Sequence, residues 1–336
     1  MTFNRVGRFA SVMVVAAVIL AACSSGGTTT PAPSASQAGT GSQAATTAPV
    51  ESKAATKLKI GVAFPILDQF LQTVADGMQA KADALGVELI IVAAQEKTDV
   101  QLGQVENFIS QKVDAIVVIP VDTDAAGPMT ADAKAANIPL VYVNRRPSDL
   151  PAGVPYVGSD SLFAGTVEME ALAKLVNGKG NVVILQGDPA NEAAVLRTKG
   201  CNDVVAKNPG MKVTKTQAGN WYRDKGLSIM ENWIQTGEKI DVVCANNDEM
   251  ALGAIQALKN AKLLDKVVVG GVDATADALA AMKAGDLEVT VFQDAKGQGG
   301  GGIDAAVKLA KGEKVPDLID IPYQLVTPAN MADFIK

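Results

Sequence analysis

The stretch of sequence that decides the fold is residues 240–260, IDVVCANNDEMALGAIQALKN. Asp241–Ala245 has the short, largely apolar pattern of a buried strand, and Met250–Lys259 has the pattern of an amphipathic helix. Between them lies the polar run Asn246-Asn247-Asp248. Parallel α/β sheets bind their ligands just beyond the carboxyl ends of the strands, so this junction predicts both a fold class and a site.

The same alternation of strand and helix repeats from Lys57 almost to the C-terminus. Further strands are predicted at Leu58–Phe64, Leu89–Ala93, Ala115–Ile119, Leu140–Val143, Val182–Gln186, Val213–Thr216, Val267–Gly271 and Val289–Phe292. Further helices are predicted at Gln69–Leu85, Val100–Lys112, Leu162–Val176, Ala193–Lys207 and Ala276–Lys283. This pattern predicts an α/β protein whose parallel sheets are covered on both faces. Because so many strands exceed the usual single open sheet, we expect two doubly wound lobes.

Composition narrows the range of functions. The chain has 336 residues, of which 48% are apolar and 20% charged, enough for the large core of a two-lobed protein. A net charge of −6 argues against nucleic acid as a partner. The chain has no histidine, which removes the commonest general base, the usual Ser/His and Cys/His pairs and the commonest metal ligand. We therefore expect no enzyme activity, no cofactor and no metal site.

The first residues predict export. Arg5 and Arg8 precede the apolar run Phe9–Ala22, which is too short to span a bilayer, so residues 1–22 are predicted to be a signal peptide. The run Leu20-Ala21-Ala22-Cys23 resembles a bacterial lipobox, in which the Cys sulfur is acylated. Residues 23–57 are mostly Ser, Thr, Gly, Ala, Pro and Gln, a composition typical of a disordered tether. We expect a lipoprotein anchored by Cys23 on the outer side of the cell membrane or in the periplasm.

Two further cysteines, Cys201 and Cys244, fall on a predicted helix and in a predicted buried strand. A disulfide is chemically possible outside the cytoplasm. We expect two buried thiols instead.

Polar residues follow six of the predicted strands. They are Asp68, Asn144-Arg145-Arg146, Asp188 with Asn191, Asn246-Asn247-Asp248, Asp273 and Gln293-Asp294. Each of them alone could be a helix cap or a turn residue. Their repetition favours a shared site for a neutral ligand with many hydroxyl groups, because each hydroxyl both donates and accepts. The pattern predicts a sugar or polyol.

A glycine-rich segment offers a competing interpretation. Gly297-Gln298-Gly299-Gly300-Gly301-Gly302 formally matches the dinucleotide-binding pattern G-x-G-x-x-G. A run of four glycines meets many such patterns by chance, and the G-K-[ST] of a phosphate loop is absent. We favour close packing of a helix at a glycine-rich surface.

The folded part, from about Leu58 to Phe334, resembles periplasmic sugar-binding proteins of the galactose/glucose and ribose type, the substrate-binding components of ABC importers. The most specific stretches are Asn246–Ala254 and Gly270–Ala274. The resemblance implies the type I periplasmic binding protein fold, a monomer whose two lobes close over one monosaccharide and deliver it to a membrane permease. The implied lobes are residues 58–159 with 293–320 and residues 160–292 with 321–336. Three hinge strands join them near Gly158-Ser159, Gln293-Asp294 and Ile321-Pro322.

The resemblance also implies ligand contacts. Asp68 would bind a hydroxyl, and the rings of Phe70 and Trp221 would stack on opposite faces of the sugar. The other implied contacts are Asn144, Arg145, Asn191, Arg197, Asn247, Asp273 and Gln293. Among these, Gln293 replaces an amide that is usually Asn, and Asn144 replaces the acid of an Asp-Arg pair.

Departures from the galactose type leave the ligand open. Asn191 and Ala193 stand where that type has His and Asp, Pro120 stands where an Asn is expected, and the calcium loop has no counterpart. A pentose, a hexose, a cyclitol or a derivatised sugar would each fit. Two other functions stay open. One is a sensor that presents its ligand to a chemoreceptor or kinase, and the other is an exported enzyme using acids such as Asp160 or Asp188.

Overall fold

The computed structural model describes residues 57–335. The chain divides into two units, Met1–Ala54 and Ala55–Lys336, and all described residues belong to the second. The predicted signal peptide, Cys23 and the predicted tether up to residue 56 lie outside the described residues. None of the helices in residues 57–335 combines the length and apolar character needed to cross a membrane.

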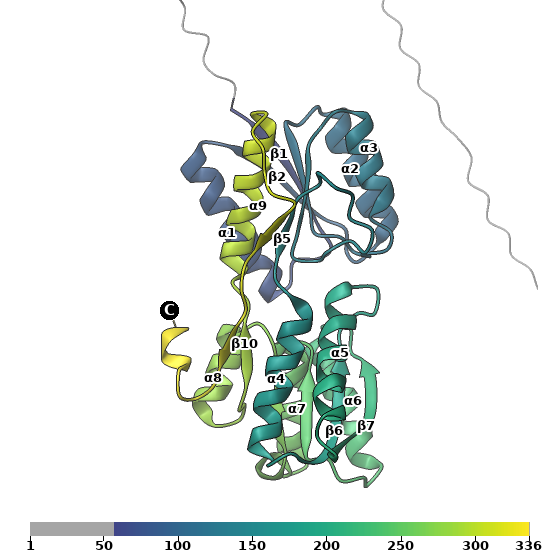
Figure 1. Ribbon diagram of the computed structural model, residues 1–336, viewed down its shortest axis with the longest axis vertical. Coiled ribbons are helices and arrows are strands. Elements are labelled where there is room, and N and C mark those ends of the chain that lie inside the picture. Colours follow the sequence, from purple (N-terminus) through teal and green to yellow (C-terminus); the bar gives the residue numbers. More distant parts are fainter. Residues whose placement is uncertain (1–56, 336) are drawn as a thin grey trace, which may run out of the picture. The chain divides into compact units, whose positions relative to one another are not determined.

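The N-terminal lobe is built on a six-stranded sheet in which all neighbouring strands are parallel. Its strands are β1 (Lys59–Phe64), β2 (Glu88–Ala93), β3 (Ala115–Val118), β4 (Leu140–Val143), β5 (Tyr156–Gly158) and β11 (Leu318–Asp320). Its helices are α1 (Gln69–Leu85), α2 (Thr98–Ser110), α3 (Gly127–Ala135) and α9 (Ala295–Ala310). The strand order is β11-β5-β4-β3-β1-β2. Helices α1 and α9 cover one face, and α2 and α3 cover the other (Figure 1).

The C-terminal lobe has a four-stranded parallel sheet and a separate antiparallel pair. The parallel strands are β6 (Lys179–Gln186), β7 (Gly210–Ala218), β8 (Val242–Ala245) and β9 (Val268–Gly270), in the order β7-β6-β8-β9. The antiparallel pair is β10 (Thr290–Phe292) with β12 (Gln324–Val326). The helices are α4 (Ser161–Leu175), α5 (Glu192–Ala206), α6 (Arg223–Gln235), α7 (Asp248–Asn260) and α8 (Ala276–Ala284). Single 3-10 turns lie at Leu264–Lys266 and Met331–Asp333.

Alternating side chains on each strand supply a core to both faces of a sheet. In β6, Val183 and Leu185 pack with α6 and α7, whereas Val182 and Ile184 pack with α4 and α5. Because both faces are buried, a central strand such as β8 is apolar throughout and short. This is the pattern from which the sequence predicted parallel sheets, and the predicted fold class is confirmed.

The chain passes between the lobes three times. It leaves the first sheet after β5 to enter α4, returns between β10 and α9, and leaves again between β11 and β12. The antiparallel β10–β12 pair joins the second and third of these passages. The sequence predicts β10 within Val289–Phe292 but does not predict its partner β12, which is three residues long.

The glycine-rich segment is helical. Residues 297–302 lie within α9, so the dinucleotide-loop alternative is wrong and the expected close helix packing is confirmed. A Cβ atom placed on Gly299 would lie 2.1 Å from the backbone oxygen of Val74 in α1. From the other side, a Cβ on Gly77 would lie 2.5 Å from the backbone oxygen of Lys296. The glycines therefore allow the backbones of α1 and α9 to touch.

This packing predicts opposite effects at neighbouring glycines. Gly299→Ala is expected to lower the free energy of unfolding by about 1–3 kcal/mol, because α1 and α9 must move apart. Gly300→Ala is the matched control, since its nearest atom is the Lys81 side chain at 3.6 Å. It should stabilise the helix by up to about 1 kcal/mol. Urea denaturation of both variants measures the difference, and equal stabilities would contradict the close approach at Gly299.

The expectation of two buried thiols is wrong, because Cys201 and Cys244 form a disulfide. Helix α5 packs over the parallel sheet so that Cys201 faces Cys244 of β8, and neither residue has any exposed surface. Their Cα atoms are 6.8 Å apart. The sequence gives only a helix position and a strand position separated by 43 residues, whereas the packing of the helix on the strand brings the sulfurs together.

Removal of the disulfide should lower stability. For a loop of 43 residues, restriction of the unfolded chain corresponds to about 4 kcal/mol. The double variant Cys201→Ala/Cys244→Ala is expected to unfold at lower urea concentration than the oxidised protein. Reduced and oxidised protein compared in the same titration provide the control without any substitution. Identical midpoints would show that the bridge contributes nothing.

Candidate ligand-binding site

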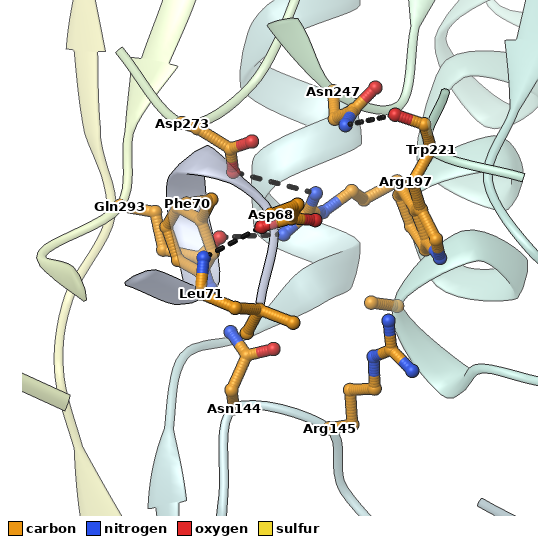
Figure 2. Close-up of a pocket in the computed structure, with 11 residues that line it drawn as sticks. Asp68, Phe70, Leu71, Asn144, Arg145, Arg197, Trp221, Asn247, Asp273 and Gln293 are labelled. Carbon is orange, nitrogen blue, oxygen red and sulfur yellow. Dashed lines mark hydrogen bonds and ion pairs between the residues drawn. The ribbon is translucent and has the colours of Figure 1, made fainter. Parts of the chain in front are cut away.

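One pocket that draws its lining from both lobes gathers most of the predicted contacts (Figure 2). Nine of the ten residues that the sequence predicts as ligand contacts line it. They are Asp68, Phe70, Asn144, Arg145, Arg197, Trp221, Asn247, Asp273 and Gln293. Leu71 and Ala193 complete the lining. Most of these residues lie just after a strand, at the carboxyl edge of a parallel sheet, where such folds bind ligands.

Two of the predicted contacts also cap helices. Asp68 Oδ1 accepts from the backbone N–H of Leu71 at 2.7 Å, and Asn247 Oδ1 accepts from that of Met250 at 3.1 Å. A cap uses one oxygen of the side chain. The second carboxylate oxygen of Asp68 stays available for another partner. Asn247 Nδ2 donates to the backbone oxygen of Trp221 at 3.2 Å, which leaves one N–H of its amide available. Capping and pocket lining, which the sequence presents as alternatives, are therefore combined in the same side chains.

Arg197 is the centre of the hydrogen-bond network in the pocket. It projects from α5 and is 4% exposed. Its Nη1 donates to the backbone oxygen of Asn246 at 2.7 Å. Its Nη2 donates to Gln293 Oε1 at 3.0 Å and to Tyr323 Oη at 2.7 Å. Since Gln293 and Tyr323 belong to the second and third passages between the lobes, one guanidinium connects the pocket to both.

Asp273 is a buried carboxyl beside this guanidinium. Its nearest oxygen lies 4.0 Å from Arg197 Nη1. Burial raises the pKa of Asp273 well above its usual value, and Arg197 only partly opposes this effect. The backbone at Asp273 has φ of 126°, which L residues rarely adopt. Strain of this kind clusters at binding sites, so it supports a ligand-binding role for this side chain.

Phe70 and Trp221 lie on opposite sides of the pocket (Figure 2). Trp221 has φ of 74°, a left-handed conformation that is unfavourable for a bulky residue. Its ring lies against Gly187, where an added Cβ would come within 2.1 Å of the indole. The Cζ of Arg197 lies 5.7 Å from the ring centroid. The Trp221 ring is therefore held in place between Gly187 and Arg197.

Arg145 contacts the segment in which the N-terminal lobe lacks the expected amide. Pro120 occupies the position where an Asn was expected, and Arg145 Nη1 donates to its backbone oxygen at 3.2 Å. The same nitrogen lies 3.4 Å from the oxygen of Val121. Arg145 Nη2 lies 3.7 Å from Glu96 Oε1. Burial raises the pKa of Glu96, and Arg145 opposes this.

Asn191 is the one predicted contact that does not line the pocket. It has no exposed surface, and both ends of its side chain bind protein atoms. Nδ2 donates to the backbone oxygen of Val121 at 2.8 Å, and Oδ1 accepts from the indole Nε1 of Trp221 at 2.9 Å.

Sequence analysis did not identify four other residues of the network. One is Leu71 in the first turn of α1, and another is Glu96 in the loop after β2. The other two are Gln298 in the glycine-rich helix and Tyr323 in the last passage between the lobes. Gln298 Oε1 accepts from Asn144 Nδ2 at 2.9 Å, and its Nε2 donates to Ser159 Oγ at 2.9 Å. A polar residue on the apolar face of α9 was the only signal that could have identified Gln298.

Asp248, the last residue of the polar run Asn246-Asn247-Asp248, has a structural role. Its carboxylate accepts from Thr290 Oγ1 at 2.7 Å and from the backbone N–H of Thr275 at 2.8 Å. It is fully buried, and desolvation raises its pKa from 3.8 to about 6. The carboxylate thus joins the loops after β8 and β9, which carry Asn247 and Asp273.

A raised pKa has a defined effect on stability. The folded protein binds the Asp248 proton more tightly than the unfolded chain does, so this group makes stability fall as pH rises from about 4 to 6. The shift corresponds to about 3 kcal/mol at neutral pH. Urea denaturation at about pH 4 and pH 7 should therefore give a flatter pH dependence for Asp248→Asn than for the unsubstituted protein. Parallel curves for the two proteins would contradict the assignment.

The pocket lining has as many acidic as basic side chains. The carboxyl groups of Asp68 and Asp273 lie among the guanidinium groups of Arg145 and Arg197, and burial raises the pKa of both carboxyl groups. Hydrogen-bond donors and acceptors therefore line the pocket together with two aromatic rings, which add apolar area. This combination suits a neutral ring that carries several hydroxyl groups.

Comparison with known proteins agrees with this geometry. Residues 60–314 match the model of the periplasmic binding protein domain. The “Putative rhizopine-binding protein” of Rhizobium meliloti is 48% identical over 84% of this chain and 94% of its own length. The ribose import binding protein of Salmonella typhimurium is 32% identical over 85% of this chain and 96% of its own length.

A solved structure extends the comparison. An ABC transporter solute-binding protein from Bacillus halodurans with bound myo-inositol is 44% identical, with a TM-score of 0.81 over 83% of this chain and 97% of that one. The expectation of a non-enzymatic binding protein is confirmed. The chain belongs to the periplasmic binding protein family and, within it, to the sugar- and polyol-binding solute-binding proteins of ABC transporters, which bind substrates for transport and are not enzymes.

Proposed function

We propose that this protein captures a neutral cyclitol of the myo-inositol class in the pocket between its lobes and delivers it to an ABC permease. The observation that carries this proposal is the convergence of hydrogen-bonding and aromatic side chains from both lobes on one pocket. The solved relative with bound myo-inositol, 44% identical, supports the ligand class. A monosaccharide offers the same chemistry of vicinal hydroxyls and is the alternative ligand.

The lining provides partners for hydroxyl groups on all sides of such a ring. Arg145 and Arg197 donate only, Asp68 accepts when ionised, and Asn247 and Gln293 can do both. Phe70 and Trp221 would cover the two faces of the ring with apolar area. A saturated ring with a hydroxyl on each carbon uses every one of these groups, whereas an anionic ligand would leave the carboxyl groups opposed to it.

The lobes are expected to close around the ligand by movement at the three passages between them. Gly158-Ser159, Gln293-Asp294 and Ile321-Pro322 are the expected hinge positions. Hydrogen bonds from Ser159 Oγ to the oxygen of Ile321 and from Gln298 to Ser159 support this, because they connect the first and third passages with α9. A hinge that carries its own polar network can change geometry without leaving buried groups unpaired.

Thermal unfolding against a ligand panel tests the proposal. The chain from residue 24 onward would be heated with myo-inositol, other inositols, xylitol, D-ribose, D-galactose and amino sugars at millimolar concentration. At micromolar affinity the expected stabilisation is about 4 kcal/mol, which raises the midpoint by several degrees. A response to D-ribose or D-galactose alone would establish the monosaccharide alternative. No response to any member, from folded protein free of bound ligand, would overturn the proposal.

We also propose that Cys23 carries the lipid that anchors the protein. The support is the sequence Leu20-Ala21-Ala22-Cys23 after an apolar leader. Cells grown with labelled palmitate should label the protein, and Cys23→Ser should abolish the label and release the protein from the membrane fraction. Cys201 and Cys244 serve as internal controls because both are consumed in the disulfide. Membrane retention of Cys23→Ser without label would contradict the anchor.

A further inference from the structure

Two segments from different lobes meet beside the pocket and bond directly to each other. Thr123 lies in the loop after β3. Ala190 lies just before α5, and Glu192 is the first residue of that helix. The backbone N–H of Thr123 and its Oγ1 both lie 3.0 Å from the oxygen of Ala190. The backbone N–H of Glu192 donates to Thr123 Oγ1 at 3.2 Å. The hydroxyl of Thr123 is therefore paired in both directions by the opposite lobe.

Asn191 adds a fourth bond to the same junction. Its Nδ2 donates to the backbone oxygen of Val121 at 2.8 Å, again from the C-terminal to the N-terminal lobe. Asn191 has no exposed surface, and Thr123 is 4% exposed. Residues 121–123 and 190–192 thus form a hydrogen-bonded contact in which Val121, Thr123 and Asn191 are buried, and we call this contact the interlobe latch.

The interlobe latch is connected to one pocket side chain in each lobe. In the N-terminal lobe, Arg145 Nη1 lies 3.4 Å from the same Val121 oxygen that Asn191 binds. In the C-terminal lobe, the indole Nε1 of Trp221 donates to Asn191 Oδ1 at 2.9 Å. A continuous path therefore runs from Arg145 through Val121 and Asn191 to Trp221.

We infer that Asn191 and Thr123 are positioning residues, which hold the lobes closed and fix the Trp221 ring but do not touch the ligand. The inference rests on the proposed function, since it concerns how the same pocket retains its ligand. The bonds of Thr123 and the Asn191–Val121 bond cross between lobes, so they exist only when the two segments meet. Each of them favours the closed form and thereby raises the apparent affinity of any ligand that needs closure.

Two substitutions of Asn191 separate its two bonds. Asn191→Asp keeps an oxygen for the Trp221 indole but replaces the donor to Val121 with an acceptor. Asn191→Leu, of similar size, removes both bonds. Thr123→Val removes only the hydroxyl of Thr123. Thr130→Val is the matched control, because its buried hydroxyl bonds within the N-terminal lobe to Ala126 and Tyr142 and is no part of the interlobe latch.

The first measurement is myo-inositol binding by the otherwise unchanged chain. Thr123→Val should weaken binding by about threefold to tenfold, and both Asn191 variants by about tenfold or more, mainly through faster dissociation. Thr130→Val should bind like the unsubstituted protein. If Asn191→Asp loses affinity while Thr123→Val keeps it, Asn191 touches the ligand and the inference is overturned. If all three variants bind normally, the latch contributes nothing and the inference also fails.

The second measurement needs no ligand. The chain has two tryptophans, and Trp233 lies in the core of the C-terminal lobe. In a Trp233→Phe background, fluorescence therefore reports Trp221 alone. Asn191→Leu should shift the emission to longer wavelength, because the indole is no longer held by Asn191 and becomes more exposed to water, whereas Asn191→Asp and Thr123→Val should not. An unshifted Asn191→Leu spectrum would overturn the positioning of the ring.

Failure of the proposed function would look different. The unsubstituted protein would then bind no member of the ligand panel, while the emission of Asn191→Leu would still differ from that of Asn191→Asp. If instead the interlobe latch has no role, the protein would bind its ligand, and substitutions at residues 123 and 191 would change neither its affinity nor its emission.

Discussion

Trp221→Ala is expected to weaken ligand binding well over tenfold while the protein stays folded. The ring forms one wall of the pocket opposite Phe70, and no other aromatic side chain of residues 57–335 lines that wall. Loss of a buried aromatic face removes contact area that hydrogen bonds do not replace. A change of tenfold to a hundredfold corresponds to about 1.4–2.7 kcal/mol. Isothermal titration with the ligand identified in the panel measures the effect.

Variants at neighbouring positions make this result specific. Trp221→Phe keeps an aromatic face and should lose less affinity than Trp221→Ala. Gly187→Ala leaves the indole intact but displaces it, because the new Cβ would lie 2.1 Å from the ring, so it should reproduce part of the loss. Folding of every variant is checked by its thermal midpoint. A folded Trp221→Ala protein with unchanged affinity would show that the pocket is misassigned.

Arg197→Met is expected to abolish measurable binding and to destabilise the protein. This one guanidinium donates to the backbone oxygen of Asn246, to Gln293 and to Tyr323, and it lies 4.0 Å from the buried carboxyl of Asp273. Without it, several buried acceptors lose their donor at once. Removing one partner of a buried charge pair typically lowers stability by about 3–5 kcal/mol. Loss of the guanidinium also removes the group that opposes the raised pKa of Asp273, so this carboxyl should keep its proton to still higher pH.

Arg223→Met is the matched control for this effect. Arg223 forms ion pairs with Glu249 and Asp277, both at 2.7 Å, but its side chain is 44% exposed. Exposed pairs of this kind contribute about 0–1 kcal/mol, so this variant should unfold near the midpoint of the unsubstituted protein. Arg197→Lys should recover charge but not the three bonds, and it should bind weakly. Normal affinity of Arg197→Met would exclude Arg197 from the site.

Most residues of the pocket lining could be predicted because the parallel sheets bring them together. Parallel strands bring their carboxyl ends to one edge, so residues such as Asp68 and Asp273 could be assigned to one pocket from their position after a strand. The sequence could not show that Asp68 both caps a helix and lines the pocket, because capping and ligand binding have the same sequence signature. Tyr323 was missed for another reason. It contacts Arg197 across a sequence separation of 126 residues, and no local pattern marks that contact.

Asn191 shows what a single sequence leaves undecided. Its position matches a ligand contact of related proteins, and in the structure its amide nitrogen donates to Val121 while its oxygen accepts from the indole of Trp221. Whether a polar side chain faces a ligand or a neighbouring loop depends on distances of a few ångströms between lobes. That information is absent from a single sequence.

The sequence by itself determined the fold class, the two lobes and the chemistry of the pocket lining. Hydrophobic periodicity and turn residues are local signals, and a parallel sheet converts them into a common edge. Only the tertiary structure decided that Cys201 pairs with Cys244, that the glycines of α9 lie against α1, and that Asn191 links the lobes. Each of these depends on how one packed element faces another, which is set by contacts between residues distant in the chain.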